Sequence, residues 1–347
     1  LLQIIFRQKF FSKPYQNLVV LLSKNREKGE KDMAVKTVQA TINGQTYTLT
    51  LNSTSGKYEA TVTAPSKSSY NQSGHYYGVT VKATDVAGNI TTKDAADATL
   101  GTSLRLHVKE KVAPIIAITA PTAGTYLTNN KPTITWKVTD TDSGVNPATI
   151  GITIDSGTKI TGDSIVKTAI TGGYQCTYIP ATALSDGSHT IKLDASDYDG
   201  NAAGTSSTSF KVDTVPPTLT LSSPADKLVT NVASCTVKGT TNDVTSSPVT
   251  VTVKLNSGTA ETVSVGNDGS FNKTLTLTSG TNTIIVVAKD SAGKTTTVTR
   301  TVTLDTTAPT IKSVKITPNP IDCGKTFVIS VEAVSYTHLT LPTTPYV

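Results

Sequence analysis

Apolar and polar residues alternate over short runs throughout the middle of the chain. Ile134, Trp136 and Val138 are separated by single polar residues, and residues 249–253 repeat the pattern with valine. A period of two buries one row of side chains and leaves the other in water, as in a half-buried strand. Thr, Ser, Val and Ile are abundant, and β-branched residues suit a pleated surface better than a helix. The pattern predicts an all-β protein with Trp136 in its core.

Two motifs recur along this pattern. An Ala-x-Asp-x-x-Gly sequence follows an alternating strand at 83–88, 195–200 and 288–293. A proline-containing junction opens a new strand around Pro114, Pro217 and Pro309. In the first motif, Asp and Gly suit a hairpin turn between the last two strands of each unit. The junctions recur at intervals near the ~100 residues of an immunoglobulin-type sandwich, so the repeat predicts tandem immunoglobulin-like β-sandwich domains.

The repeat divides the chain into domains of unequal completeness. We expect complete immunoglobulin-like domains at 111–213 and 214–306, a shortened one at 33–110 and the truncated start of another at 307–334. The shortened domain matches only the later strands of its neighbours. Asn43-Gly44 predicts a two-residue hairpin turn, and residues 56–62 match the strand that follows Gly269.

The two ends of the chain differ from the repeat. Residues 27–33 can be encoded by a purine-rich ribosome-binding site followed by a Met codon. We therefore interpret residues 1–32 as a non-native leader and Met33 as the true start. Residues 335–347 fit no repeat and resemble translated adapter sequence, so we interpret them as an artefact tail. No apolar run in residues 1–32 approaches the ~20 residues of a membrane span.

The net charge of +6 does not indicate nucleic-acid binding. Residues 1–32 hold seven Lys and Arg residues against three acids, which leaves the rest of the chain nearly neutral. Nearly neutral modules with few aromatic residues lack the basic surface and the stacking platforms that nucleic acids require. We expect no nucleic-acid partner and no membrane span.

The Val-Asp-Thr-x-x-Pro junctions and the Ala-x-Asp-x-x-Gly-Asn motif resemble those of bacterial Ig-like (Big-type) domains. Arrays of this family occur in bacterial surface adhesins and in bacteriophage tail and virion proteins. The resemblance spans residues 34–334 and implies the fold more strongly than a function, because this sandwich hosts many roles. The functions that it implies are stalks and modules that bind glycans or cell-surface polymers.

The resemblance also implies a cofactor, since some arrays of this family bind calcium at their junctions. The candidate ligands are the junction acids Asp213 and Asp305, grouped with the motif acids of the turns that precede them, Asp197, Asp199 and Asp290. Calcium takes six to eight oxygens, which such loops can supply together with backbone carbonyls. The alternative is that these acids only form turns. Residues 140–144 resemble the opening of a calcium loop, but Gly151 stands where the loop requires glutamate, so a connection between strands explains them better.

No catalytic residues can be assigned, and we expect no enzyme. Catalysis requires a converging nucleophile, base and orienting group, and residues 33–334 contain only three histidines. One of them, His189, aligns with Tyr77 and Asn282 at the start of one strand in each module, where a polar side chain more often bonds to the preceding corner. Cys176 and Cys235 fall in different modules, so we expect small buried core residues instead of a disulfide.

The sequence therefore predicts a non-enzymatic part of a surface-exposed assembly. Because no export signal follows Met33, we favour a bacteriophage tail or virion protein that contributes to attachment to host cell-surface polysaccharide, alongside other virion or surface proteins. The alternative is a stalk or spacer of a bacterial adhesin at the cell surface or secreted. No loop shows an aromatic cluster typical of sugar stacking, so the sequence names no ligand.

Overall fold

The computed structural model describes residues 2–6, 20–24 and 34–335. Regular structure in these residues is almost entirely β-strand, and the helices are 3-10 turns of three or four residues, which confirms the all-β prediction. The chain divides into two compact units. The first comprises Leu1–Ala123, Pro132–Ala181 and His189–Ser209, and the second comprises Gly124–Lys131, Thr182–Ser188 and Phe210–Val347.

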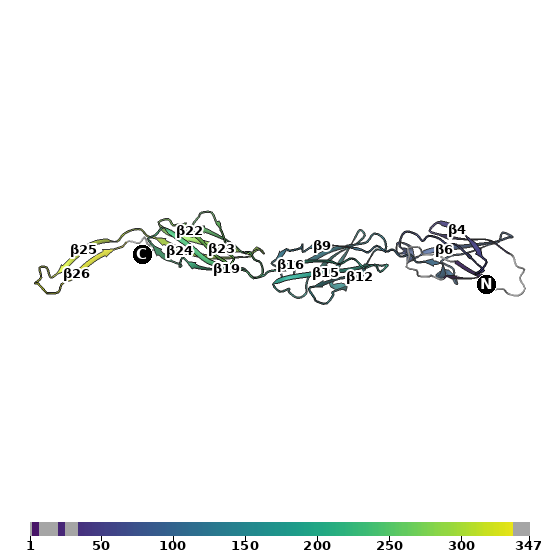
Figure 1. Ribbon diagram of the computed structural model, residues 1–347, viewed down its shortest axis with the longest axis horizontal. Coiled ribbons are helices and arrows are strands. Elements are labelled where there is room, and N and C mark those ends of the chain that lie inside the picture. Colours follow the sequence, from purple (N-terminus) through teal and green to yellow (C-terminus); the bar gives the residue numbers. More distant parts are fainter. Residues whose placement is uncertain (1, 7–19, 25–33, 336–347) are drawn as a thin grey trace, which may run out of the picture. The chain divides into compact units, whose positions relative to one another are not determined.

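Residues 115–212 form a sandwich of two four-stranded sheets (Figure 1). One sheet has the order β13-β14-β11-β9 and the other has the order β10-β16-β15-β12. The strands are β9 (Ile115–Ala120), β10 (Tyr126–Leu127), β11 (Ile134–Thr139), β12 (Val145–Ile154), β13 (Val166–Ile170), β14 (Gly173–Tyr178), β15 (Gly187–Asp197) and β16 (Ser206–Val212), with η4 (Gly162–Ser164) before β13. This strand order is that of an immunoglobulin-like sandwich, as predicted.

The core of this middle sandwich follows the alternation seen in the sequence. Ile134, Trp136 and Val138 on β11 are fully buried, whereas Lys137 between them is exposed. Trp136 lies opposite Cys176 of β14. Burial raises the pKa of the Cys176 thiol to about 11, so this side chain acts as a small apolar core residue, as expected.

Residues 218–304 form the third module, a second complete sandwich. Its sheets have the orders β17-β19-β22 and β18-β24-β23-β20-β21. The strands are β17 (Thr218–Ser223), β18 (Leu228–Thr230), β19 (Ser234–Asn242), β20 (Thr250–Leu255), β21 (Glu261–Val263), β22 (Ser270–Thr276), β23 (Gly280–Lys289) and β24 (Thr295–Leu304). Val237, Val251 and Val286 from three of these strands are fully buried in one core with Cys235.

The two complete sandwiches share an opening strand that changes sheets. In the middle sandwich β9 pairs with β11, and after Pro121 the chain pairs through β10 with β16 in parallel. The third module repeats this change at Pro224. Proline has no backbone N–H, so it interrupts the ladder where the chain crosses between sheets. The sandwiches differ in one strand, because β13 pairs with β14 whereas β21 pairs with β20.

Residues 34–110 form the N-terminal module, which has a single sheet of order β5-β4-β3-β6-β7, with β8 paired to β6. The strands are β3 (Val35–Ile42), β4 (Gln45–Asn52), β5 (Lys57–Glu59), β6 (Tyr77–Asp85), β7 (Ile90–Lys93) and β8 (Arg105–Leu106). Asn43 and Gly44 both have positive φ, as the predicted two-residue turn requires. The expected match between 56–62 and the strand after Gly269 holds for its start, because β5 and β22 both follow a glycine with positive φ. The two strands differ in that β5 is short and pairs with its neighbour β4, whereas β22 pairs with β19.

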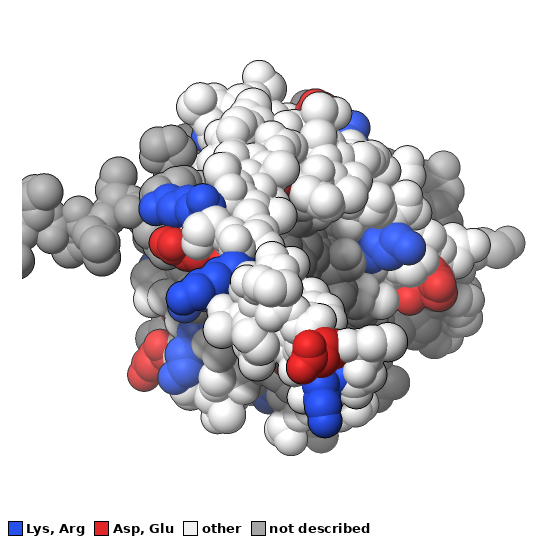
Figure 2. All heavy atoms as spheres, turned by 90° about the vertical axis from the view of Figure 1, so that its left-hand side faces the viewer, with Lys and Arg blue, Asp and Glu red and all other residues white. Residues whose placement is uncertain are grey.

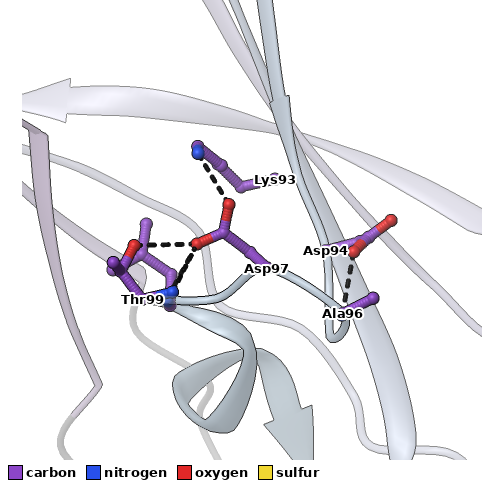
Figure 3. Close-up of polar contacts among 6 residues, drawn as sticks. Lys93, Asp94, Ala96, Asp97 and Thr99 are labelled. Carbon is purple, nitrogen blue, oxygen red and sulfur yellow. Dashed lines mark hydrogen bonds and ion pairs between the residues drawn. The ribbon is translucent and has the colours of Figure 1, made fainter.

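Loops and 3-10 turns stand beside this sheet where the other modules have further strands. The turns are η1 (Ser69–Asn71), η2 (Ser73–His75) and η3 (Gly101–Leu104). The Asp97 carboxylate accepts hydrogen bonds from Lys93 Nζ at 2.6 Å and from the backbone N–H of Thr99 at 3.0 Å (Figure 3). The hydrogen bond from Lys93, followed by those from Leu100 and Thr99, holds the pKa of Asp97 well below its usual range. This carboxylate orders the segment that leads to the fully buried Leu104.

Two further hairpins flank these modules in the sequence. The strands are β1 (Leu2–Phe6) with β2 (Val20–Lys24), and β25 (Thr310–Thr317) with β26 (Val328–Val334). The second hairpin contains the two strands expected after Pro309, and nearly all its residues are exposed. The domain limits predicted at 110, 213 and 306 stay predictions. The leader and tail predictions concern residues that lie largely outside those that the structure describes.

Candidate metal centres

The Ala-x-Asp-x-x-Gly motif forms the same turn in all three modules, as predicted. In the middle sandwich Asp197 Oδ1 accepts a hydrogen bond from the backbone N–H of Asn201 at 2.7 Å. The N–H of Gly200, which has a φ of 91°, donates to the Asp197 carbonyl at 3.3 Å. Corresponding bonds form at Asp85 and at Asp290. Each motif aspartate therefore lies at the end of the module where the turn between its last two long strands is found.

The first cluster of acids consists of Glu110, Asp140 and Asp197, whose nearest carboxylate oxygens all lie within 4.8 Å of one another. Asp140 follows β11, Asp197 ends β15, and Glu110 precedes β9. The two aspartates are buried and Glu110 is half-buried. Glu110 Oε1 accepts a hydrogen bond from the N–H of Ser143 at 2.9 Å, so the segment before the sandwich is bound to its β11–β12 loop.

The second cluster consists of Asp213, Asp243 and Asp290, whose nearest carboxylate oxygens also lie within 4.8 Å of one another and which are all buried. Asp243 follows β19 and Asp290 follows β23, so they occupy the positions that Asp140 and Asp197 occupy in the middle sandwich. Asp213 precedes β17, as Glu110 precedes β9, and accepts a hydrogen bond from Ser246 Oγ. The same three places in the fold therefore carry acids in both complete sandwiches.

One residue of the turn makes the two clusters chemically different. Asn201 donates its side-chain amide to Asp197 Oδ2 at 2.6 Å and to the Glu110 carbonyl at 3.2 Å. Lys294 stands at the corresponding position in the third module and gives only its backbone N–H to Asp290 Oδ1, at 2.8 Å. Asp290 Oδ2 is consequently buried without a hydrogen-bond partner. Such an oxygen is destabilising unless something binds it.

The donor sets of both clusters fit a hard cation. In the described part of the chain, no Lys, Arg or His side chain forms an ion pair with either cluster. Each pair of carboxylates at this separation repels by on the order of 3 kcal/mol at an effective dielectric constant of ~20. Ser143 Oγ, next to the first cluster, is also buried without a partner. Oxygen donors with this charge suit Ca²⁺, which Glu110, Asp140 and Asp197 would hold in one module and Asp213, Asp243 and Asp290 in the next.

The structure distributes the five predicted ligands differently from their order in the sequence. Asp197 joins the first cluster, and Asp213 and Asp290 join the second. Asp199 lies outside both, and its Oδ2 accepts a hydrogen bond from the Glu110 N–H at 3.0 Å. Asp305 also lies outside both, and its Oδ1 accepts one from the Thr307 N–H at 2.9 Å.

Three cluster residues, Glu110, Asp140 and Asp243, were not among the predicted ligands. The prediction grouped each junction acid with the turn that precedes it in sequence, whereas the fold brings it to the turn of the following sandwich. Asp140 lies in a loop between two strands, as interpreted, and still contributes a ligand oxygen. The missed signal was an acid directly after corresponding strands, β11 and β19, of two repeats.

The position shared by His189, Tyr77 and Asn282 bonds to chain corners, as the sequence alignment suggested. His189 Nδ1 lies 2.9 Å from Asp155 Oδ2, at the end of the preceding β12 hairpin. Asn282 Oδ1 accepts a hydrogen bond from the Thr278 N–H at 3.0 Å. The Tyr77 hydroxyl donates to the Lys67 carbonyl at 3.1 Å. These contacts give the three side chains structural roles.

Charged side chains of both signs are interspersed on the face that Figure 2 shows. This distribution gives no single-sign patch on that face of the kind that phosphate binding requires. Within the described residues, no helix has the length and apolar character needed to cross a membrane.

Comparison with known proteins agrees with the strand topology. Residues 120–214 match the bacterial Ig-like domain family, and residues 217–306 match domain B of glucodextranase. Bacillopeptidase F of Bacillus subtilis (strain 168) is 32% identical over 185 residues, which cover 53% of this chain. The matched region is only 11% of that protein's length.

Two solved structures show low similarity. The fibronectin(III)-like modules of Clostridium thermocellum CbhA are 18% identical, with a TM-score of 0.31, over 55% of this chain and 94% of theirs. Sidekick-1 immunoglobulin domains 1–5 are 10% identical, with a TM-score of 0.37, over 95% of this chain and 67% of theirs. The assignment rests on the strand order and the family matches. The chain carries a bacterial Ig-like domain at residues 120–214, followed by a second Ig-like sandwich at 217–306 that is similar to glucodextranase domain B.

Proposed function

We propose that the chain is a non-enzymatic spacer segment of a surface-exposed assembly, in which calcium binds the first and second junctions to the sandwiches that follow them. The observation that supports this best is the recurrence of a three-carboxylate cluster at corresponding places in two successive sandwiches. A turn-forming role accounts for any one of these acids. It does not account for three buried or half-buried acids meeting twice.

The proposed ion acts on the segments that connect modules. Glu110 and Asp213 lie in these segments, whereas the other two acids of each cluster lie in loops of the following sandwich. An ion shared by all three offsets their mutual repulsion and fixes the connecting segment to the sandwich. A segment held in this way samples fewer conformations, which suits a spacer that sets reach and stiffness.

The sequence predicts that this spacer belongs to a phage tail or virion, and the alternative is a bacterial cell surface. Both placements stay predictions, as does the attachment to host polysaccharide. The genes beside the coding sequence distinguish them: tail or capsid genes would favour the virion, and cell-wall or export genes the bacterial surface.

Calcium binding by the full chain tests the proposed spacer directly. Titration calorimetry after chelator treatment should show two calcium sites, and millimolar calcium should raise the melting temperature. The double variant Glu110→Gln/Asp213→Asn should lose both effects, because each cluster then lacks its junction charge. Asp305→Asn is the matched control, since Asp305 is a junction acid outside both clusters. No binding heat, with equal melting temperatures in calcium and in chelator, would overturn the proposal.

A further inference from the structure

The N-terminal module carries a surface cluster that the other two modules lack among the described residues. It consists of Tyr70, His75, Tyr76, Arg105 and His107, and we refer to it as the aromatic cluster. The Tyr70 ring also stacks on Tyr198 of the middle sandwich, with ring centroids 5.1 Å apart. The Tyr70 and His75 ring centroids lie 4.7 Å apart, and those of Tyr76 and His107 lie 6.5 Å apart. The Arg105 guanidinium lies 4.7 Å from the Tyr76 centroid. The expectation that no loop carries an aromatic cluster is therefore wrong.

Backbone contacts join the two halves of the aromatic cluster. His107 Nδ1 lies 3.0 Å from the His75 carbonyl, and His75 Nδ1 lies 3.3 Å from the Tyr70 carbonyl. Residues 70–76 and 105–107 are separated in sequence, and the contact between His107 and the His75 carbonyl joins the two segments. The sequence signal was the run of three tyrosines and a histidine within residues 70–77.

An unusual backbone presents these side chains. Gly74 has a φ of 76° and His75 a φ of 59°, and a left-handed non-glycine residue is uncommon. A Cβ at Gly74 would lie 2.8 Å from the Tyr76 ring, so close packing as well as φ requires glycine there. The segment lies in the connection from β5 to β6. Left-handed backbone of this kind is a type of local strain common at binding sites.

The polar groups of the aromatic cluster are cationic or neutral. His75, Arg105 and His107 are exposed. Tyr70 and Tyr76 are half-buried, and the Tyr70 ring contacts both His75 and Tyr198. Within the residues that the structure describes, Arg105 forms no ion pair with a carboxylate. A guanidinium binds carboxylates through directed N–H groups, and aromatic rings offer flat apolar surfaces to ring-shaped ligands.

From this combination we infer that the aromatic cluster binds an acidic polysaccharide whose sugar rings carry carboxylates, such as a polyuronate. The C–H faces of a sugar ring pack on the exposed histidine rings and on Tyr76, the hydroxyls bond to the imidazoles, and the carboxylate pairs with Arg105. This binding function goes beyond the proposed spacer and does not depend on calcium at the clusters.

Affinity electrophoresis of the full chain tests the inference. Gels contain polygalacturonate, alginate or hyaluronan at 0.15 M salt, where weak surface electrostatics are screened. The wild type should be retarded by at least one of these polymers and not by carboxyl-reduced polygalacturonate or dextran. Arg105→Gln and, separately, His107→Ala should weaken the binding at least tenfold. Both positions are exposed, and circular dichroism confirms that each variant is folded.

Lys211→Gln is the matched control, because Lys211 Nζ lies 5.1 Å from the Tyr126 ring centroid in the middle sandwich. This variant should bind as the wild type does. Retardation by none of the three acidic polymers overturns the inference, and so does equal retardation by the neutral polymers. Equal loss in Lys211→Gln shows a general charge effect, and displacement of the polymer by equimolar single-stranded DNA assigns the surface to nucleic acid; both outcomes also overturn it. Calcium titrations on the same samples report separately on the spacer.

Discussion

The two carboxylate clusters occupy corresponding places in successive sandwiches and yet differ in how their charges are satisfied. In the middle sandwich, Glu110 is half-buried and Asn201 donates to both the motif aspartate and the junction backbone. In the third module all three acids are buried, and one oxygen of Asp290 has no partner. The first cluster is partly stabilised by the protein's own donors. The second depends more strongly on a cation.

This difference shows how one position can decide whether a turn is self-sufficient. The Asp–Gly turn itself is the same in both modules, because backbone N–H groups close it. The side chain four residues after the aspartate differs, an amide in one module and an ammonium in the other. An amide that donates to the carboxylate satisfies it, whereas a lysine that gives the carboxylate only its backbone N–H leaves the other carboxylate oxygen open to an ion.

Removal of one charge from the second cluster should have the largest effect. Asp243→Asn keeps the acceptor oxygen that the Thr245 and Ser246 N–H groups use and removes one of the three charges. With free calcium at about 100 times its Kd, the variant should lose about 2.7 kcal/mol of calcium stabilisation. In chelator the stability of the variant should equal or exceed that of the wild type, because the repulsion among the cluster carboxylates is smaller. Hydrogen exchange of β19–β24 peptides, followed by mass spectrometry, measures the stability of the third module in calcium and in chelator.

Asp140→Asn is the matched change in the first cluster and should show the same reversal with a smaller amplitude. Its exchange would be followed in peptides from β11–β16. If Asp243→Asn destabilised the third module equally in calcium and in chelator, the residue would be a loop former alone.

Swapping the residues that follow the two turns should give each cluster the properties of the other, with a smaller effect on calcium stabilisation than the removal of a carboxylate. Lys294→Asn should give Asp290 Oδ2 a donor, stabilise the chelated protein by about 1 kcal/mol and reduce its response to calcium. The reverse change, Asn201→Lys, should destabilise the chelated middle sandwich by a similar amount and enlarge its response. Thermal denaturation of both variants with and without calcium provides the measurement. Unchanged calcium responses in both would contradict the comparison.

Asp85 provides the smallest expected effect, because among the described residues it belongs to neither of the two three-carboxylate clusters. Asp85→Asn should leave the calcium response of the chain unaltered. The hydrogen bond from the Asn89 side chain is the main cause that lowers the pKa of Asp85 below its ordinary value of 3.8. Its stabilising contribution is therefore present above about pH 4 and is lost as the pH falls below 3.8 toward the folded-state pKa.

The loss of stability on protonation of Asp85 is measured by melting curves at pH 5 and pH 3. Between these values the wild type should lose more stability than Asp85→Asn, because only the wild type has this carboxylate to protonate. An equal loss in both proteins would show that the turn does not depend on the charge.

Local patterns predicted local structure well and spatial neighbours poorly. The alternation around Trp136 and the Asn43-Gly44 turn depend on residues adjacent in the chain, and both predictions are confirmed. The convergence of Asp213 with Asp290 depends on strand order, since the last turn of a sandwich returns to the end where its chain begins. Sequence order placed Asp213 with the preceding turn, and only topology corrects this. The aromatic cluster was likewise missed because Arg105 and His107 join it from a distant segment.

The crossing of the opening strand between sheets determines how each sandwich responds to pulling. Tension applied to the two ends of a module draws β10 past β16, or β18 past β24, along their own length, because each pair is parallel. All hydrogen bonds of such a pair are loaded together in shear and must break almost at once. The middle sandwich has two residue pairs in this contact and the third module has three. Of these two sandwiches, we therefore expect the middle one to unfold first under a rising force.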